Sequence, residues 1–330
     1  MANTSSPNIL NISELCNISD SLNVPNLSGS PSTLEVRKSA LDVPLSWNPK
    51  ASHRERDKIE FIEDGHYYLV NGQRMNNSVT QLVHKYFNGF EAEKTARTML
   101  ARNDFLVNKR YEKYWDLVGD LVRNGNKKDA TGRTFFDIAV DRVTRKWEDD
   151  GDEAAGDGTI MHKSIEKFYL TGEVSDTKEF QMFMNFHNYV TSLGYIPFRT
   201  ESLVWSVKYS IAGSVDMLYI HKDDVDKEVK RGKIFDWKRT REIKTFGFGK
   251  KGIGPMSDKA DCNYEHYSLQ LNIYKYLLER SYNIIINRMT LVILHPNQDD
   301  YELHEVPVNK AAVREILHIV KSELETNNTA

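Results

Sequence analysis

The centre of the chain carries polar residues whose types and spacing suit metal-dependent cleavage of a phosphodiester. Asp216, Asp236 and His162 form a set of ligands that divalent cations accept. Mg²⁺ prefers oxygen ligands, and Mn²⁺ also tolerates an imidazole. Because water must attack a phosphorus atom shielded by negative oxygens, a site for this reaction has to hold such cations beside the scissile group. The residues therefore indicate a nuclease.

A lysine stands where it would assist this chemistry. Lys238 follows Asp236 by two residues in a strand-like run. Since side chains alternate with period two along a strand, we expect both on one face, beside the metal. Asp216 comes directly after the apolar Val215. Burial of an unpaired carboxylate there would be costly, and a bound cation would compensate it.

Further polar residues extend the candidate site. Glu166 shares a helix stripe with His162, and Gln270 and Tyr274 lie one helical turn apart. Glu201 belongs to an earlier strand-like run. Each has a plain structural alternative: Glu166 could pair with neighbouring lysines on an exposed helix, and Gln270 and Tyr274 could border the core.

The most basic stretch of the chain follows Lys238 directly and contains a single acid, Glu242. Its cationic and aromatic residues could contact phosphates and stack on bases. They are Arg239, Arg241, Lys244, Phe246, Phe248, Lys250 and Lys251. A solvated loop without a ligand is the alternative. Residues 247–252 also fit GxGxxG, but Pro255 stands where a helix should open, so we expect no dinucleotide site.

Composition is that of a globular protein. The 330 residues, 40% hydrophobic and 28% charged, suffice for one large domain with an added lobe or for two modest domains. The formal net charge of −3 does not by itself indicate nucleic-acid binding, so we expect the basic residues to be concentrated in one part of the surface. No apolar run approaches the roughly 20 residues that span a bilayer, and we expect no membrane partner. Cys16 and Cys262 are too few for a disulfide framework or an iron–sulfur cluster.

The N-terminal sequence has no secretory pattern of a basic segment followed by an apolar one. We expect an intracellular protein, whether nuclear, cytoplasmic or viral, and not a secreted one. A mitochondrial location has little support, because the first arginine is Arg37 and the acids Glu14 and Asp20 interrupt the segment.

Three regions are expected along the chain. Residues 1–50, rich in Ser and Asn, are typical of a flexible tail. Residues 51–150 predict a hairpin and a mainly helical lobe, in which Ser78 and Gln81 have capping-box spacing. The helix opened there is expected to bury Leu82, Val83, Tyr86, Phe87 and Phe90. Expected anchors of the lobe are Trp115, Leu117, Leu121, Phe136, Ile138, Val143 and Trp147.

Residues 151–330 are expected to form the catalytic domain. The acidic, glycine-rich segment 148–158 predicts a loop leading into a helix over 158–170. Further helices are expected over 179–192 and 264–280, with a closing amphipathic helix. Strands are expected over 199–209, 211–220, 233–238, 289–294 and 301–308. This order predicts an α/β (α+β) fold, a mixed central sheet flanked by helices, preceded by the helical lobe.

Four motifs in this region together resemble the RecB-type branch of the PD-(D/E)XK nuclease superfamily. They are GTIMHKSIE at 158–166, GSVD at 213–216, DWK at 236–238 and QLNIY at 270–274. The superfamily includes recombination exonucleases, mitochondrial genome maintenance exonucleases, CRISPR adaptation nucleases and nucleases of large DNA viruses. The resemblance covers roughly residues 157–308, only loosely the lobe before them, and implies a restriction-endonuclease-like fold.

The resemblance implies a role for each matching residue. His162, Asp216 and Asp236 would hold Mg²⁺ or Mn²⁺, with the Trp237 carbonyl as a further ligand. Lys238 would orient or help deprotonate the attacking water, or stabilise the charged transition state.

The same resemblance implies that Gln270 and Tyr274 position the substrate or Lys238. Glu201 matches an acidic position that would touch a second metal or face solvent, and Glu166 is a further candidate ligand.

The sequence also departs from the family pattern. Val215 replaces the proline of the family name, and Asp236 has a reach shorter by one methylene than the alternative glutamate. The iron–sulfur cluster of some relatives is excluded, and no GxxxxGK[ST] segment indicates a P-loop motor.

The resulting expectation is a Mg²⁺- or Mn²⁺-dependent deoxyribonuclease, an exonuclease more than an endonuclease, acting in DNA repair or recombination. Phosphate contacts carry no sequence information, so broad sequence tolerance is expected. Expected partners are DNA, single-stranded or at duplex ends, and replication or recombination proteins. Two alternatives stay open: an RNA endonuclease of the cap-snatching type, and a non-catalytic nucleic-acid-binding module on a nuclease scaffold.

Overall fold

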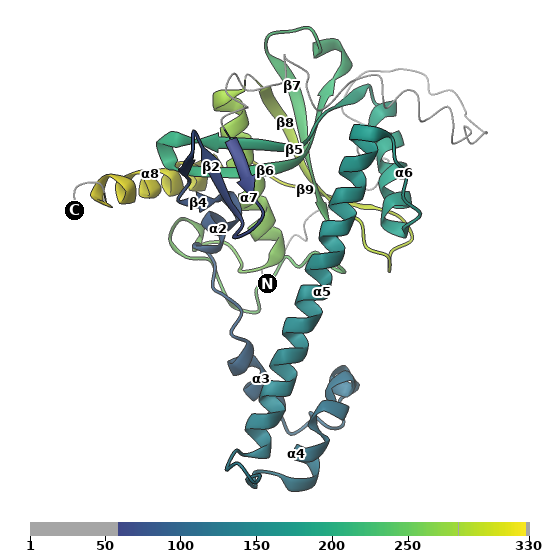
Figure 1. Ribbon diagram of the computed structural model, residues 1–330, viewed down its shortest axis with the longest axis vertical. Coiled ribbons are helices and arrows are strands. Elements are labelled where there is room, and N and C mark those ends of the chain that lie inside the picture. The colour runs from purple at the N-terminus through teal and green to yellow at the C-terminus, as the bar shows by residue number, and fades with distance from the viewer. Residues whose placement is uncertain (1–58, 283, 328–330) are drawn as a thin grey trace, which may run out of the picture. The chain divides into compact units, whose positions relative to one another are not determined.

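The computed structural model describes residues 59–282 and 284–327, and the tail predicted over 1–50 lies outside them. The described chain forms two compact units (Figure 1). The larger contains 59–88 and 160–327, and the smaller contains 89–159. The hairpin that we grouped with the N-terminal lobe therefore belongs to the larger unit.

A six-stranded mixed sheet forms the centre of the larger unit, as the sequence predicts. Its strands are β4 (Asn77–Ser78), β5 (Tyr195–Ser206), β6 (Ile211–His221), β7 (Lys230–Lys238), β8 (Ile284–Ile293) and β9 (Glu302–Glu305). The order is β4-β6-β7-β8-β9, with β5 also paired to β6. The pairs β4/β6 and β7/β8 are parallel, and the other pairs are antiparallel.

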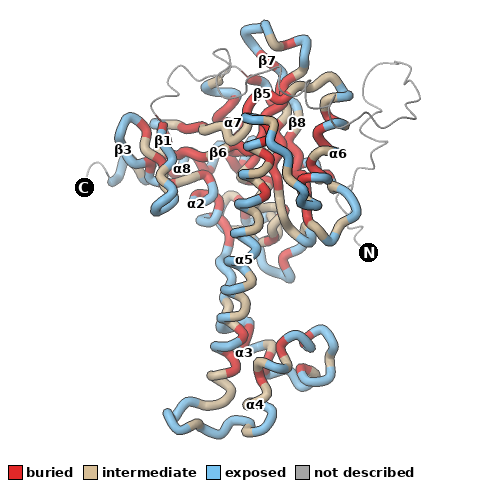
Figure 2. The backbone as a smooth tube through the Cα atoms, turned by 45° about the vertical axis from the view of Figure 1, so that its right-hand side comes forward, coloured by how far each residue is buried: buried red, intermediate tan, exposed pale blue. Residues whose placement is uncertain are grey.

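Helices flank both faces of this sheet, and the buried strands lie between them (Figure 2). On one face, Phe235 and Trp237 of β7 pack with Phe186 of α6 (Lys178–Ser192) and with the C-terminal part of α5 (Phe135–Thr171). On the other, Ile234 shares a core with α2 (Val79–His84), α7 (Asn263–Ser281) and α8 (Lys310–Asn327). The period-two alternation along β7 thus sends successive side chains to opposite layers.

The N-terminal hairpin forms as its turns predict. It consists of β1 (Ile59–Ile62), β2 (Tyr67–Val70) and β3 (Gln73–Arg74), and Gly65 and Gly72 take positive φ values of 92° and 75° in the turns. The predicted capping box is confirmed: the Ser78 hydroxyl accepts the Gln81 N–H, and the Gln81 side chain accepts the Ser78 N–H.

The apolar stripe expected after this cap is shorter than predicted. Leu82, Val83, Tyr86 and Phe87 are buried, but Phe90 is 66% exposed. Because α2 ends at His84, Phe90 lies beyond the helix and belongs to the smaller unit, where its ring lies 5.4 Å from that of Trp147.

The loop predicted over 148–158 is wrong, because these residues lie inside α5, a helix of 37 residues. Each glycine in a helix costs about 1 kcal/mol relative to alanine. Packing on either side outweighs that cost, since most helix stability comes from tertiary contacts of an apolar face. Val143 lies in the core of the smaller unit, and Ile165 and Phe168 lie in a core of the larger one.

The smaller unit is mainly helical, as predicted. It contains α3 (Ala92–Leu100), the 3₁₀ helices η4 (Lys109–Tyr114) and η5 (Asp116–Val118), α4 (Gly119–Asn124) and residues 135–159 of α5. Among the predicted anchors, Val143 is fully buried, while the others are partly buried. The Trp147 indole donates to the Tyr114 hydroxyl at 2.7 Å, and the Trp115 indole to the Phe105 carbonyl at 3.0 Å.

Three short 3₁₀ helices complete the larger unit: η6 (Val207–Tyr209), η7 (Lys222–Asp224) and η8 (Gly254–Met256). The predicted strand boundaries differ most at β8, which begins at Ile284 and not at Met289, and at β5, which begins at Tyr195 and not at Arg199. Within the described ranges, every helix is too short or too polar to cross a membrane.

The continuity of α5 can be tested at Gly156, where an added Cβ would meet open space. We expect Gly156→Ala to raise the free energy of unfolding by about 1 kcal/mol, measured by urea denaturation. Amide exchange over 150–160 should also become slower. As a control, Gly72→Ala should destabilise, because Gly72 has a φ of 75°. Unprotected amides over 150–158 in the unmodified protein would contradict the continuous helix.

Candidate metal centre

The site lies where one edge of β6 passes from one partner strand to another. Along this edge Met217–Ile220 pair with β7, and Ile211 and Ala212 pair with β4. Residues 213–216 lie between the two pairings. Between these two pairings this edge of β6 forms no strand ladder, so polar groups that face the gap can take part in a site.

Asp216 occupies the end of the gap next to β7. Its carboxylate, 8% exposed, accepts a hydrogen bond from the Trp237 N–H at 2.8 Å and so continues the contact between the two strands. Burial, followed by the nearby charge of Asp236, raises the pKa of Asp216 to about 7. Because burial and Asp236 both disfavour the charged form of this carboxylate, a bound cation would stabilise it.

Three predicted ligands converge at this point. Ligand atoms of His162, Glu201 and Asp216 all lie within 4.8 Å of one another. His162 Nδ1 is 3.3 Å from Glu201 Oε1 and 3.8 Å from Asp216 Oδ2, while its Nε2 is 3.1 Å from the Trp237 carbonyl oxygen. Burial alone would lower the pKa of His162, but the two acids outweigh it and raise that pKa to about 9.

The backbone of Glu201 takes an uncommon conformation to reach this cluster. Its φ is 43°, in the left-handed region that non-glycine residues seldom adopt inside a strand. The Ser214 hydroxyl donates to Glu201 Oε2 at 2.8 Å and fixes the carboxylate. Strain of this kind is concentrated at functional sites, which supports a role for Glu201. Ser214 is a residue that the sequence did not single out, although it lies inside the GSVD motif.

Asp236 and Lys238 lie on one face of β7, as the alternation predicts. Asp236 is 1% exposed, and its Oδ2 lies 2.6 Å from Lys238 Nζ. Its Oδ1 has no hydrogen-bond partner among the described residues. Burial alone would lower the pKa of Lys238, but the charges of Asp236 and Asp216 raise it above its usual value, so the ammonium form persists.

Helix α7 borders the site with Gln270 and Tyr274. The Gln270 amide donates to the Tyr274 hydroxyl at 3.2 Å and to the Thr80 hydroxyl at 3.4 Å. Tyr274 can pack against β6 because Gly213 has no side chain: an added Cβ would lie 2.8 Å from Tyr274 Cε1. Burial raises the pKa of the Tyr274 hydroxyl, and the charges of Asp216 and Asp236 contribute.

The residue of α7 that contacts Lys238 is Tyr267, whose ring centroid lies 4.8 Å from Nζ. The sequence analysis missed this residue. The spacing of Tyr267 could have identified it, because Tyr267, Gln270 and Tyr274 stand at i, i+3 and i+7 on one helix face.

The donor set fits a divalent cation. Ligands about 2.1 Å from an octahedral ion lie about 3.0 Å apart when adjacent and about 4.2 Å apart when opposite. The separations of 3.3 and 3.8 Å from His162 Nδ1 to the two acids fall within this range. The Trp237 carbonyl faces the other ring nitrogen, Nε2, and one imidazole binds a given ion through one nitrogen only. The unpartnered Oδ1 of Asp236 also requires compensation, because an unsatisfied buried carboxylate oxygen is costly.

The predicted ligands are not all equivalent. Asp236 and Glu166 lie outside the group of three, which contains Glu201 in their place. Asp236 is coupled to Asp216 by charge and paired with Lys238. The side chain of Glu166 makes no hydrogen bond or ion pair with another described residue, and burial followed by the charge of Glu201 raises its pKa.

The basic stretch after β7 is a folded loop. The Asp261 N–H donates to the Lys250 carbonyl at 3.0 Å, and Lys251 forms an isolated bridge with Ala260. Phe246 and Phe248 are 53% and 77% exposed, with ring centroids 4.7 Å apart.

The predicted phosphate contacts of this loop differ in their availability. The exposed residues are Arg241, Lys244, Lys250 and Lys251. Arg239 instead forms an ion pair with Glu179 of α6 at 2.8 Å, with both side chains largely buried. This pairing gives Arg239 a structural role that competes with substrate contact.

Comparisons with known proteins add little to this description. No family model and no curated protein matches the chain. Among solved structures, that of SSO0001 is 15% identical, covers 71% of this chain and 87% of that chain, and superposes with a TM-score of 0.25. A "Putative exonuclease" from Eubacterium rectale is 8% identical, covers 72% and 67%, and has a TM-score of 0.23. Superpositions this poor carry no argument about this chain.

The raised pKa values predict a pH dependence of metal binding. Ligands must be deprotonated to bind, and the pKa of His162 is about 9 and that of Asp216 about 7. Binding therefore displaces a proton from His162 below pH 9 and a second, from Asp216, below pH 7. We expect Mn²⁺ affinity to rise roughly tenfold per pH unit between pH 7 and 8.5.

Isothermal titration calorimetry in buffers of different ionisation enthalpy measures this proton release. His162→Gln should bind Mn²⁺ more weakly, and its Mn²⁺ affinity should no longer change with pH above pH 7. An affinity of the unmodified protein that does not change with pH would contradict the assigned ligands.

Proposed function

We propose that this protein is a divalent-metal-dependent nuclease of the PD-(D/E)XK type that hydrolyses DNA, as an exonuclease with little sequence specificity. The observation that supports this proposal is the convergence of His162, Glu201 and Asp216 beside the Asp236 and Lys238 pair. These five side chains come from four elements, α5, β5, β6 and β7, and all carry groups that phosphodiester hydrolysis requires.

The metal would be Mg²⁺ or Mn²⁺, held by His162, Glu201 and Asp216, with the unpartnered Oδ1 of Asp236 available beside them. A divalent ion bound there would lower the pKa of a coordinated water and neutralise charge on the leaving oxygen. The His162 contact with the Trp237 carbonyl orients the imidazole, since the second ring nitrogen determines how the first is presented.

Lys238 would act as a fixed positive charge. Its pKa is raised by Asp236 and Asp216, so at neutral pH it cannot take a proton from water. It would orient the attacking water by hydrogen bonding and stabilise negative charge that develops on the phosphate oxygens. Of the roles that the resemblance implies for this lysine, the ion pair supports these two over proton removal.

The basic loop after β7 would contact the nucleic acid. Exposed cations bind phosphates without regard to sequence, and exposed aromatic rings stack on unpaired bases. Phe246 and Phe248 adjoin four exposed cations in this loop, a composition that supports binding of single-stranded DNA or frayed ends.

Replacing Lys238 tests the chemistry directly. We expect Lys238→Ala to reduce cleavage at least about 10²-fold, because one charged group that stabilises the transition state is lost. Mn²⁺ binding should be retained, and Lys208→Ala, which changes an exposed lysine, should keep full activity. End-labelled DNA and RNA, each linear and circular, are digested side by side with Mn²⁺.

The substrates separate the alternatives. Preference for linear DNA supports the proposal, and cleavage of RNA alone would identify an RNA endonuclease. Full activity of Lys238→Ala, or no cleavage of any substrate by a Mn²⁺-loaded protein, would overturn the proposed function.

The aromatic pair of the basic loop provides a second test. The double variant Phe246→Ala and Phe248→Ala should weaken binding of single-stranded DNA by roughly tenfold, because each lost stacking contact contributes about 1–3 kcal/mol. Fluorescence anisotropy with a labelled oligonucleotide measures the change. Ile285→Ala, which removes an apolar side chain 51% exposed on β8, is the control and should have no effect. Equal affinity of the double variant and the control would exclude a stacking role.

A further inference from the structure

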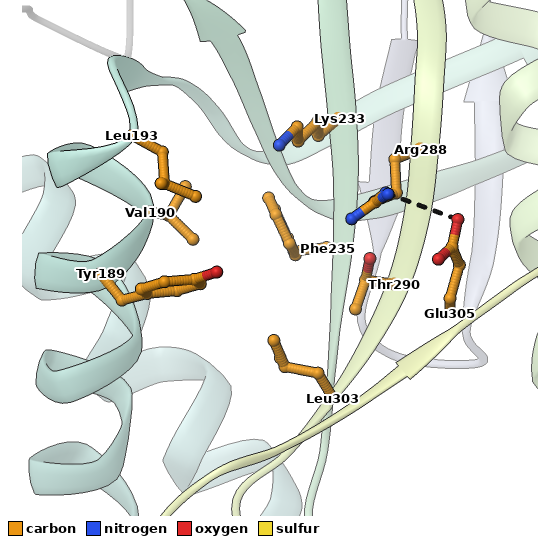
Figure 3. Close-up of a pocket in the computed structure, with 9 residues that line it drawn as sticks. All are labelled: Tyr189, Val190, Leu193, Lys233, Phe235, Arg288, Thr290, Leu303 and Glu305. Atoms are coloured by element: carbon orange, nitrogen blue, oxygen red, sulfur yellow. Dashed lines mark ion pairs between the residues drawn. The ribbon is translucent and has the colours of Figure 1, made fainter. Parts of the chain in front are cut away.

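A pocket lies between α6 and strands β7 to β9 (Figure 3). Its cavity volume is about 30 Å³, far below the range of roughly 300–1,000 Å³ found for drug-sized ligands, so it suits an ion of a few atoms. The lining residues are Tyr189, Val190, Leu193, Lys233, Phe235, Arg288, Thr290, Leu303 and Glu305. Lys233 and Phe235 have the opposite orientation on β7 to Asp236, and none of the ligand candidates His162, Glu201 and Asp216 lines the pocket.

The pocket contains more positive than negative charge. Lys233 and Arg288 are its cations, and Glu305 is its one acid. Glu305 Oε1 lies 3.4 Å from Arg288 Nε. Among the described residues, no carboxylate lies within ion-pairing distance of Lys233, and the partner of its ammonium is the ring of Tyr195, with 3.7 Å to the centroid. One positive charge in the pocket is therefore not balanced by an anion.

This charge is also partly removed from water. Burial, followed by the positive charge of Arg288, lowers the pKa of Lys233 to about 8. A desolvated ammonium without an anion is unfavourable, and a bound anion would reverse that effect.

Polar groups gather on one part of the pocket wall. Figure 3 shows the Lys233 ammonium, a terminal nitrogen of Arg288 and the Tyr189 hydroxyl all directed at the central space. The Thr290 hydroxyl lies beside Arg288 in the same view. Ammonium, guanidinium and hydroxyl groups are donors that suit the oxygens of an anion.

The rest of the wall is apolar. Val190 of α6, Leu193 directly after that helix, Phe235 of β7 and Leu303 of β9 supply it. Apolar walls of this kind strengthen the attraction between the polar groups and a bound ion.

We propose that this pocket binds a small oxyanion, a phosphate or carboxylate group, between Lys233 and Arg288. The assignment does not depend on nuclease activity, because no metal ligand lines the pocket.

Calorimetry on the metal-free protein, from which the chelator has been removed by dialysis, tests the assignment. The probes are inorganic phosphate and acetate, titrated in chloride buffer. Lys233→Met keeps the length of the side chain and removes its charge, so anion affinity should fall at least about tenfold. Lys222→Met, which changes an exposed lysine outside the pocket, is the matched control and should bind as the unmodified protein does.

Arg288→Met is a second variant, and a loss of affinity there supports the site independently if Lys233→Met does not fold. Phosphate and acetate distinguish the two kinds of oxyanion. Absence of binding by both probes, or equal affinity of Lys233→Met, Arg288→Met and the control, would overturn the assignment. Because metal and cleavage are not involved, these outcomes are independent of the proposed nuclease.

Discussion

The burial of two neighbouring carboxylates determines the local structure of the larger unit. Asp216 and Asp236, on adjacent strands, are 8% and 1% exposed. A buried charge is strongly unfavourable unless other groups balance it. The Trp237 N–H, the Lys238 ammonium and the His162 imidazole balance part of that charge, and Asp236 Oδ1 has no hydrogen-bond partner among the described residues. The arrangement therefore favours a cation at this point.

The fold around these two acids departs from regular structure at three places, each of which makes room for a group of the site or brings one to it. One edge of β6 is shared between β4 and β7, and the gap leaves the Trp237 amide free to bond to Asp216. Glu201 takes a positive φ to bring its carboxylate to His162. Gly213 lacks a side chain where Tyr274 approaches β6. Each departure is unfavourable in itself and is stabilised by the packed sheet on which it lies.

Features determined by local rules could be predicted from the sequence. The alternation along β7 placed Asp236 and Lys238 on one face, and the spacing of Ser78 and Gln81 predicted a capping box. The loop expected over 148–158 failed because local glycines were weighed without the tertiary packing that anchors both sides of α5. The left-handed backbone of Glu201 has no sequence signal.

Contacts between residues far apart in the chain could not be predicted from the sequence either, because they too depend on tertiary packing. Arg239 binds Glu179, which lies 60 residues earlier in the chain, and only the tertiary fold brings the two together.

The most direct test of a cation centre is an anomalous difference map from crystals grown with Mn²⁺, recorded at the manganese absorption edge. The predicted result is a peak coordinated by His162, Glu201 and Asp216. Well-ordered side chains at these positions with no peak among them would contradict it.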